Sequence, residues 1–217
     1  MAASQSLRTM MVDTQVRPSD VTKFPIIAAM LDVPREAFVP GNAVSVAYMD
    51  GPVPLTSGRE LLDARAFAKM LDALDIGRGD DVLIVGGNLG YSTAVLSRMA
   101  QSVVMVEEDA AMAREAEATL AAQDVDNAAV LEGRLEDGAA KAAPFDVILI
   151  EGGVETVPET LLAQIKDGGR IAALFQQGAL GEVRVGRASG GAVAWRFAFN
   201  ASAPVLPGFA KKRDFVL

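Results

Sequence analysis

The sequence predicts a doubly wound α/β fold with a mostly parallel sheet, a C-terminal antiparallel hairpin and an N-terminal helical extension. Three observations lead to this prediction. Short apolar runs alternate with helical segments from residue 81 onward, a glycine-rich turn follows the first run, and two alternating segments meet at Gly190-Gly191. The chain has 217 residues, of which 51% are hydrophobic and 22% charged, so it can form one large core.

The first 32 residues have the spacing of two helices. A break is expected at residues 17–20, where Arg-Pro-Ser-Asp interrupts the pattern. Asp20 is then the expected N-cap of the second helix, and Pro25 is acceptable only in that helix's first turn.

A proline-rich segment links these helices to the rest of the chain. Residues 33–57 contain four prolines, which favours an extended connector without regular structure. Residues 61–74 return to helical spacing with one apolar face. We therefore expect residues 1–60 to pack as helices and connector against an α/β domain of residues 61–217, forming one compact unit.

The remaining elements suit a Rossmann-like arrangement. Five apolar runs have the composition of strands buried on both faces, and helical segments between them complete right-handed βαβ units. Two alternating segments around a Gly-Gly pair then form a hairpin. The strands are expected at residues 82–85, 103–106, 128–131, 147–150 and 171–175, the helices at about 91–100, 109–122 and 157–166, and the hairpin at 182–188 and 192–200.

Composition excludes several kinds of chemistry. The chain has no Cys and no His, so disulfides, thiolate or imidazole catalysis and metal sites built on these side chains are impossible, and we expect no metal. The net charge of −8 offers no cationic field, so we expect no nucleic-acid partner. No stretch reaches the length of a membrane span, and the N-terminus lacks an apolar leader. We expect a cytoplasmic protein that does not bind membranes.

The turn after the first strand is the first candidate site. In a doubly wound sheet, ligands bind outside the carboxyl ends of the strands, where this turn lets the backbone approach them. Gly86 and Gly87 can adopt positive φ, and Gly90 permits close passage at the start of the next helix. The alternative is a tight strand-to-helix turn without a ligand, because glycines also mark turns in general.

Other polar positions converge on the same end of the sheet. Glu107 ends the second strand about 20 residues after the turn, where an acid can accept hydrogen bonds from both ribose hydroxyls of a nucleoside. Glu108 follows as a second candidate, whereas Asp109 suits the start of the next helix. Glu151 ends the fourth strand and faces either this crevice or a solvated loop. Gly133 follows the third strand, where an adenine-facing loop is expected.

Three segments then identify a family. Residues 33–40 read VPREAFVP, residues 47–55 read AYMDGPVPL and residues 90–96 read GYSTAVL. They resemble the signatures VPRE.FVP, AY.D.PLPI and GYQTAVLA of the protein-L-isoaspartate O-methyltransferase family, within the S-adenosylmethionine-dependent methyltransferases. The similarity runs from about Met11 to the C-terminus, and five parallel strands followed by a hairpin also fit this superfamily.

The resemblance implies transfer of a methyl group from S-adenosylmethionine to the carboxylate of isoaspartyl residues in damaged proteins or peptides, as a step in repair. A carboxylate is nucleophilic at neutral pH and needs mainly positioning, so the absence of His is compatible with this reaction. We expect the cofactor to be bound by Gly86, Gly87, Gly90, Glu107, Glu108, Gly133 and Glu151, and the substrate to lie near Val53, Pro54, Leu55, Thr56 and Ser57.

The chain departs from the family at the site itself. Where the family reads LEIGTGSGY, this chain has Ile84 in place of the acid and Asn88 in place of a glycine. Leu62 stands where the family's GQTISQP segment has a serine thought to serve the reaction, so the catalytic residue is unassigned. Arg134 replaces the acid of the family's GDG.

These departures leave alternatives open. One is a catalytically impaired, methyltransferase-like binding or regulatory protein. Another is an NAD-dependent oxidoreductase, which would require a tighter GxGxxG turn and no terminal hairpin.

Overall fold

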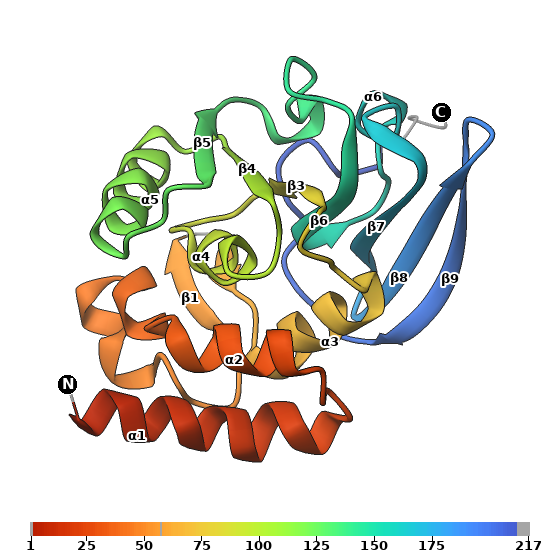
Figure 1. The fold of residues 1–217 in the computed structure, drawn as a ribbon. Helices are drawn as coiled ribbons and strands as arrows, with labels where there is room; N and C mark the ends of the chain where they lie inside the picture. Colours follow the sequence, from red (N-terminus) through yellow and green to blue (C-terminus); the bar gives the residue numbers. More distant parts are fainter. Residues whose placement is uncertain (1, 57, 212–217) are drawn as a thin grey trace, which may run out of the picture.

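The structure is a computed structural model that describes residues 2–56 and 58–211, and its centre is a seven-stranded sheet in the order β5-β4-β3-β6-β7-β8-β9 (Figure 1). Five strands run parallel, and the last two add an antiparallel hairpin, which confirms the predicted fold class. The strands are β3 (Asp81–Val85), β4 (Ser102–Glu107), β5 (Ala128–Glu132), β6 (Phe145–Val154), β7 (Ile165–Gln177), β8 (Leu180–Ser189) and β9 (Ala192–Asn200).

The central strands are buried on both faces, as their apolar runs predict. In β3, Val82 and Ile84 pack into the core on one face, while Leu83 and Val85 pack into the core on the other. All four side chains are completely buried. Side chains alternate across a strand, so one continuous apolar run supplies both cores.

Helices cover the first face and shorter segments cover the second. Figure 1 shows α1 and α2 side by side along the lower side of the molecule; α2 contacts both α1 and α3, and the π-helical turn that follows α1 also contacts α3. The helices are α1 (Ala2–Met11), extended by a π-helical turn (Val12–Val16) and a 3-10 turn (Arg17–Ser19), then α2 (Phe24–Asp32), α3 (Ala64–Leu74), α4 (Tyr91–Ser97) and α5 (Ala110–Ala122). The second face packs against a 3-10 helix (Leu135–Asp137), α6 (Glu159–Leu162) and the C-terminal segment 203–209. Within the described ranges, no helix combines the length and apolar character needed to cross a membrane.

The break between the first helices is where predicted, but the predicted cap is wrong. Asp20 has φ +67° and ends the 3-10 turn in the left-handed region, whereas an N-cap needs extended backbone. Lys23, with φ −60° and ψ 120°, precedes α2 instead. Pro25 lies in the first turn of that helix, as expected.

The connector is more ordered than the sequence indicates. It contains two 3-10 helices, Arg35–Phe38 and Gly41–Val46, and the short strand β1 (Val53–Thr56), which pairs antiparallel with β2 (Arg59–Leu61). Edge strands tolerate proline, so the four prolines of the connector did not exclude a strand here. Ser57, a predicted substrate-side residue, lies outside the described residues.

Three predicted helices are shorter than expected, and one of them, α4, ends at Ser97 instead of near residue 100. The helix expected from residue 61 begins at Ala64, because the Asp63 carboxylate accepts a 2.8 Å hydrogen bond from the Ala66 backbone N–H. The helix expected at 157–166 is reduced to α6, because Ile165 already pairs with Phe145 as the start of β7. The hairpin turn is as predicted, with Gly190 and Gly191 both at positive φ.

Candidate functional site

The glycine turn connects the carboxyl end of β3 to the start of α4. Gly86 and Gly90 have φ values of +75° and +93°, conformations that favour glycine. Gly87 does not adopt positive φ as predicted; Asn88 does so instead, at +54°. Close packing still favours glycine at position 87, because a Cβ there would lie 2.5 Å from Cγ of Met105.

Glu107 ends β4 beside this turn, and its carboxylate is completely buried. Oε2 accepts a hydrogen bond from the Asn88 backbone N–H at 2.9 Å. Oε1 accepts from the backbone N–H groups of Glu108 and Asp109 at 3.0 and 3.1 Å. The acid predicted to face the turn therefore contacts it directly.

Arg59 is the partner of Glu107 that sequence reasoning missed. Its Nη1 and Nη2 donate to the two carboxylate oxygens at 2.9 and 2.5 Å, and its side chain is 7% exposed. Nε donates to Oδ1 of Asn88 at 3.1 Å. Nη2 also lies 3.5 Å from the position that a Cβ of Gly86 would take. The guanidinium thus lies directly against the glycine turn, in the crevice predicted to bind a ligand.

Leu206 covers the same crevice from the C-terminal segment. Its Cδ1 lies 3.1 Å from the position of a Cβ on Gly86, and its Cγ and Cδ2 lie 2.6 Å from that on Gly152. The segment is fixed to β6 by two 2.8 Å backbone hydrogen bonds, from Gly153 N to Pro204 O and from Leu206 N to Gly153 O. With Arg59, this side chain leaves the Gly86 backbone enclosed by protein.

Glu151 is part of β6 and does not lie in a solvated loop. Its side chain is 2% exposed, and Oε2 accepts a short hydrogen bond from Ser92 Oγ in α4. Oε1 is buried and has no partner within the described residues. Burial raises the pKa of Glu151 to about 7, although the Ser92 hydrogen bond and the charges of Arg35 and Arg59 act in the opposite direction.

Leu62 lies in the apolar core and faces no crevice. It is 2% exposed, and its carbonyl accepts a 2.6 Å hydrogen bond from Nη2 of Arg35. Arg35 in turn stacks on the Tyr91 ring, with Cζ 4.9 Å from the ring centroid. The position expected to hold a serine therefore offers no reactive group.

The remaining predicted residues lie at the margin of the crevice. The Glu108 side chain is exposed, and only its backbone contacts Glu107. The Gly133 N–H donates to the Glu107 carbonyl at 3.0 Å, and space around its Cα is open. Arg134 is 73% exposed and pairs with Glu136, so it does not enter the crevice.

The predicted substrate-side strand β1 is not uniformly accessible. Val53 is completely buried, Leu55 is half-buried, and Pro54 and Thr56 are exposed. Within β1, only Pro54 and Thr56 have exposed side chains.

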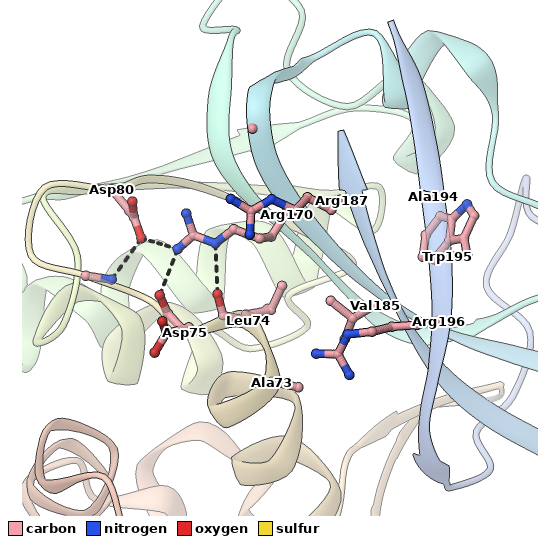
Figure 2. Close-up of a pocket in the computed structure, with 12 residues that line it drawn as sticks. Ala73, Leu74, Asp75, Asp80, Arg170, Val185, Arg187, Ala194, Trp195 and Arg196 are labelled. Atoms are coloured by element: carbon pink, nitrogen blue, oxygen red, sulfur yellow. Dashed lines mark hydrogen bonds and ion pairs between the residues drawn. The ribbon is translucent and has the colours of Figure 1, made fainter. Parts of the chain in front are cut away.

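A separate pocket of about 730 Å³ lies near the amino ends of the parallel strands (Figure 2). Arg170 lines it and donates to the carbonyls of Leu74 and Asp75, each at 2.9 Å, and to Asp80 at 2.6 Å. Arg187 of β8 lies directly opposite Arg170 in the sheet. This pocket is remote from the glycine turn, and Arg170 joins the end of α3 to the sheet.

Comparison with known proteins agrees with this architecture. The family model described as protein-L-isoaspartate(D-aspartate) O-methyltransferase matches residues 8–189. The chain is 41% identical over 167 residues to the protein-L-isoaspartate O-methyltransferase of Methylorubrum extorquens strain PA1, covering 76% of this chain and 72% of the relative. It is 37% identical over 166 residues to that of Pelotomaculum thermopropionicum, with the same shares covered.

Solved structures show the same fold. A protein-L-isoaspartate O-methyltransferase superposes with a TM-score of 0.81 at 22% identity, over 94% of this chain and 66% of that one. A putative protein-L-isoaspartate O-methyltransferase from Plasmodium falciparum, in complex with S-adenosyl-L-homocysteine, gives a TM-score of 0.78 at 16% identity, over 93% and 97% of the two chains. Since the family model spans most of the sequence and relatives exceed 30% identity, the chain belongs to the protein-L-isoaspartate(D-aspartate) O-methyltransferase family.

Proposed function

We propose that this chain uses S-adenosylmethionine to methylate the side-chain carboxylate of isoaspartyl residues in damaged proteins or peptides. Family membership and the names of its relatives support this activity. The Plasmodium neighbour binds S-adenosyl-L-homocysteine, the product form of that cofactor, which supports the choice of methyl donor. The comparisons do not favour the alternative of a catalytically impaired binding protein.

The observation that supports the cofactor assignment best is the link between Glu107 and the glycine turn. A completely buried acid at the end of the second parallel strand has the position that accepts ribose hydroxyls in nucleoside-binding sheets. The Asn88 N–H holds this carboxylate against the turn at 2.9 Å. We propose Glu107 as the ribose ligand, with Gly86 and Gly90 allowing the backbone to approach the cofactor.

In the arrangement described, side chains of the protein lie where the cofactor's ribose would approach Glu107 and the glycine turn. The Arg59 guanidinium contacts the carboxylate and the turn, and Leu206 contacts Gly86 and Gly152. The residue types suit the cofactor, but the space beside them is taken by side chains of the protein. Cofactor binding therefore requires these side chains to move.

We propose a cytoplasmic protein whose partners are isoaspartyl-containing proteins or peptides, bound near the exposed Pro54 and Thr56 of β1. The net charge of −8 gives no electrostatic attraction to nucleic acid, so the proposal includes none.

Incubation with labelled S-adenosylmethionine and an isoaspartyl peptide tests the function, with the matching aspartyl peptide as control. Label is expected on the isoaspartyl peptide alone. Glu107→Gln should weaken cofactor binding by about 1 to 3 kcal/mol, the scale of charge-assisted hydrogen bonds. Glu132→Gln, an exposed acid directly opposite in β5, is the matched control. Absence of transfer to either peptide would support the impaired alternative.

If the isoaspartyl peptide is methylated, the reaction proceeds with Leu62 in place of the family's serine. If that position alone limits the reaction, Leu62→Ser should raise the rate of transfer. An unchanged rate would indicate that the crevice around Glu107 limits the reaction instead.

A further inference from the structure

We propose that the Arg59 side chain competes with the cofactor's ribose for the Glu107 carboxylate, and so sets the affinity of this chain for S-adenosylmethionine. The inference rests on the proposed function, because it assumes that the ribose binds Glu107. It adds an affinity-determining residue from a short strand that follows the connector, 48 positions before Glu107 in the sequence.

The hydrogen bonds to Glu107 leave no acceptor capacity for a ribose. Oε1 accepts from Arg59 Nη1 and from two backbone N–H groups, those of Glu108 and Asp109. Oε2 accepts from Arg59 Nη2 and from the Asn88 N–H. These are five donors on a group with about four lone-pair sites. A ribose hydroxyl can bind to this carboxylate only if some of these donors leave.

Arg59 is the donor able to leave. The other three donors are backbone groups of the glycine turn and of the β4 end, so moving them would disrupt the sheet connection. A side chain can instead change rotamer without disturbing the backbone. When Arg59 withdraws, Glu107 keeps three backbone hydrogen bonds, which leaves about one lone-pair site for a ribose hydroxyl.

The contacts of Arg59 with the turn extend the competition beyond Glu107. Nε donates to the Asn88 side chain, and Nη2 lies beside the Gly86 backbone. Both contacts use the surface where the backbone would approach a ligand. A single guanidinium therefore occupies the ribose position and the adjoining part of the turn.

The local fold allows the Arg59 side chain to move without disruption of the seven-stranded sheet. β2 pairs only with β1, in a two-stranded sheet separate from the seven-stranded sheet. Withdrawal of Arg59 from Glu107 thus breaks no hydrogen bond of the main sheet. It does cost the buried bidentate ion pair, and this cost reduces the fraction of molecules competent to bind cofactor.

Calorimetric titration with S-adenosyl-L-homocysteine tests the proposal on the full chain, at a temperature where circular dichroism shows each variant folded. Arg59→Gln should bind about 10- to 100-fold more tightly than the wild type, the factor expected from removing charge-assisted hydrogen bonds. Arg59→Lys, which keeps the charge but not the bidentate geometry, should fall between them. Arg184→Gln removes an arginine of another ion pair, with Glu182 in β8, and should bind as the wild type does.

The outcomes separate this inference from the proposed function. Tight binding by the wild type, with equal or weaker binding by Arg59→Gln, overturns the competition while the cofactor assignment stands. No binding by either chain overturns both. A gain in affinity shared by Arg184→Gln would also overturn the inference, because it would show an effect of charge alone.

Discussion

Glu151 lies near the carboxyl end of the central strand β6, and its side chain is buried. One oxygen accepts from Ser92, and the other has no partner among the residues described. Burial raises the pKa of Glu151 to about 7, so its neutral form predominates in the folded protein below that pH. The same carboxyl group is a normal acid in the unfolded chain.

The pH dependence of stability follows from this difference. Between about pH 4.5 and 7 the folded protein binds the proton and the unfolded chain releases it, so the free energy of unfolding falls as pH rises through this window. Glu151→Gln removes the titration and can keep the Ser92 contact. The stability of the variant relative to wild type should therefore rise with pH, by about 3 kcal/mol at pH 8. Urea unfolding of both proteins from pH 4 to 8 measures this, and parallel curves would contradict it.

The positions of some candidate-site residues were predictable, because a single strand or turn determines where they lie. Glu107 follows directly from its place at the end of β4, and Gly86 and Gly90 from the turn that they form. Arg59 was not predictable in this way, because its partner is 48 residues away and nothing local marks the pair. The one available signal was that Arg59 replaces the uncharged glutamine of the family's GQTISQP segment.

At the scale of elements, Arg170 of β7 connects the C-terminal end of α3 to the sheet. The last carbonyls of a helix lack partners within the helix, and a cation there also complements the helix dipole. Arg170 donates to the carbonyls of Leu74 and Asp75, and pairs with Asp80 (Figure 2). These contacts fix the C-terminus of α3 to β7.

Arg170→Ala should therefore lower the free energy of unfolding by about 1 to 3 kcal/mol, the range for lost hydrogen bonds of a charged group. Arg187→Ala is the matched control, because Arg187 is exposed and lies directly opposite on β8. Its loss should change stability by no more than about 0.5 kcal/mol. Chemical unfolding of both variants decides the matter, and equal losses would refute the anchoring role.

The C-terminal segment depends on close approach to β6. A Cβ on Gly153 would lie 2.5 Å from the Ala203 carbonyl oxygen, which belongs to backbone and cannot rotate away. Gly153→Ala should thus cost about 2 to 4 kcal/mol, since overpacking here forces the backbone to shift. Gly133→Ala, where no atom lies within 4 Å, should cost little more than about 0.5 kcal/mol. Thermal unfolding compares them, and similar midpoints for the two variants would count against this packing.

Element boundaries show what local sequence determines. The strands with continuous apolar runs and the Gly190-Gly191 hairpin were predictable, because apolar runs and a tight turn leave direct signals. Burial on both faces was wrongly predicted for β5, which lies at the edge of the sheet and exposes Ala129 and Leu131. The expected helix at 157–166 failed because pairing of Ile165 with Phe145 overrides helical propensity. β1 was missed because strand formation there depends on its partner β2.

At the scale of the molecule, one apolar cluster joins the N-terminal helices to the sheet. Met11 and Met30, from α1 and α2, belong to the same buried cluster as Val82 of β3 and Val185 of β8. The second cluster lies on the opposite face of the sheet and includes residues from the C-terminal segment. We therefore expect residues 1–60 and 61–217 to unfold together.

Two substitutions in α2, read out at the far end of the chain, test this cooperativity. Met30 is completely buried and Phe24 is 79% exposed, so the two positions differ mainly in packing. Met30→Ala should lower the free energy of unfolding by about 2 to 5 kcal/mol, and Phe24→Ala by about 0.5 kcal/mol or less. Trp195, the single tryptophan, lies in β9 and packs on Phe175, so its fluorescence reports the hairpin. If the chain is one unit, the urea midpoint of Trp195 fluorescence shifts for Met30→Ala as much as the far-ultraviolet circular dichroism does. A shift in circular dichroism without one in fluorescence would instead show that the N-terminal helices unfold separately from the sheet.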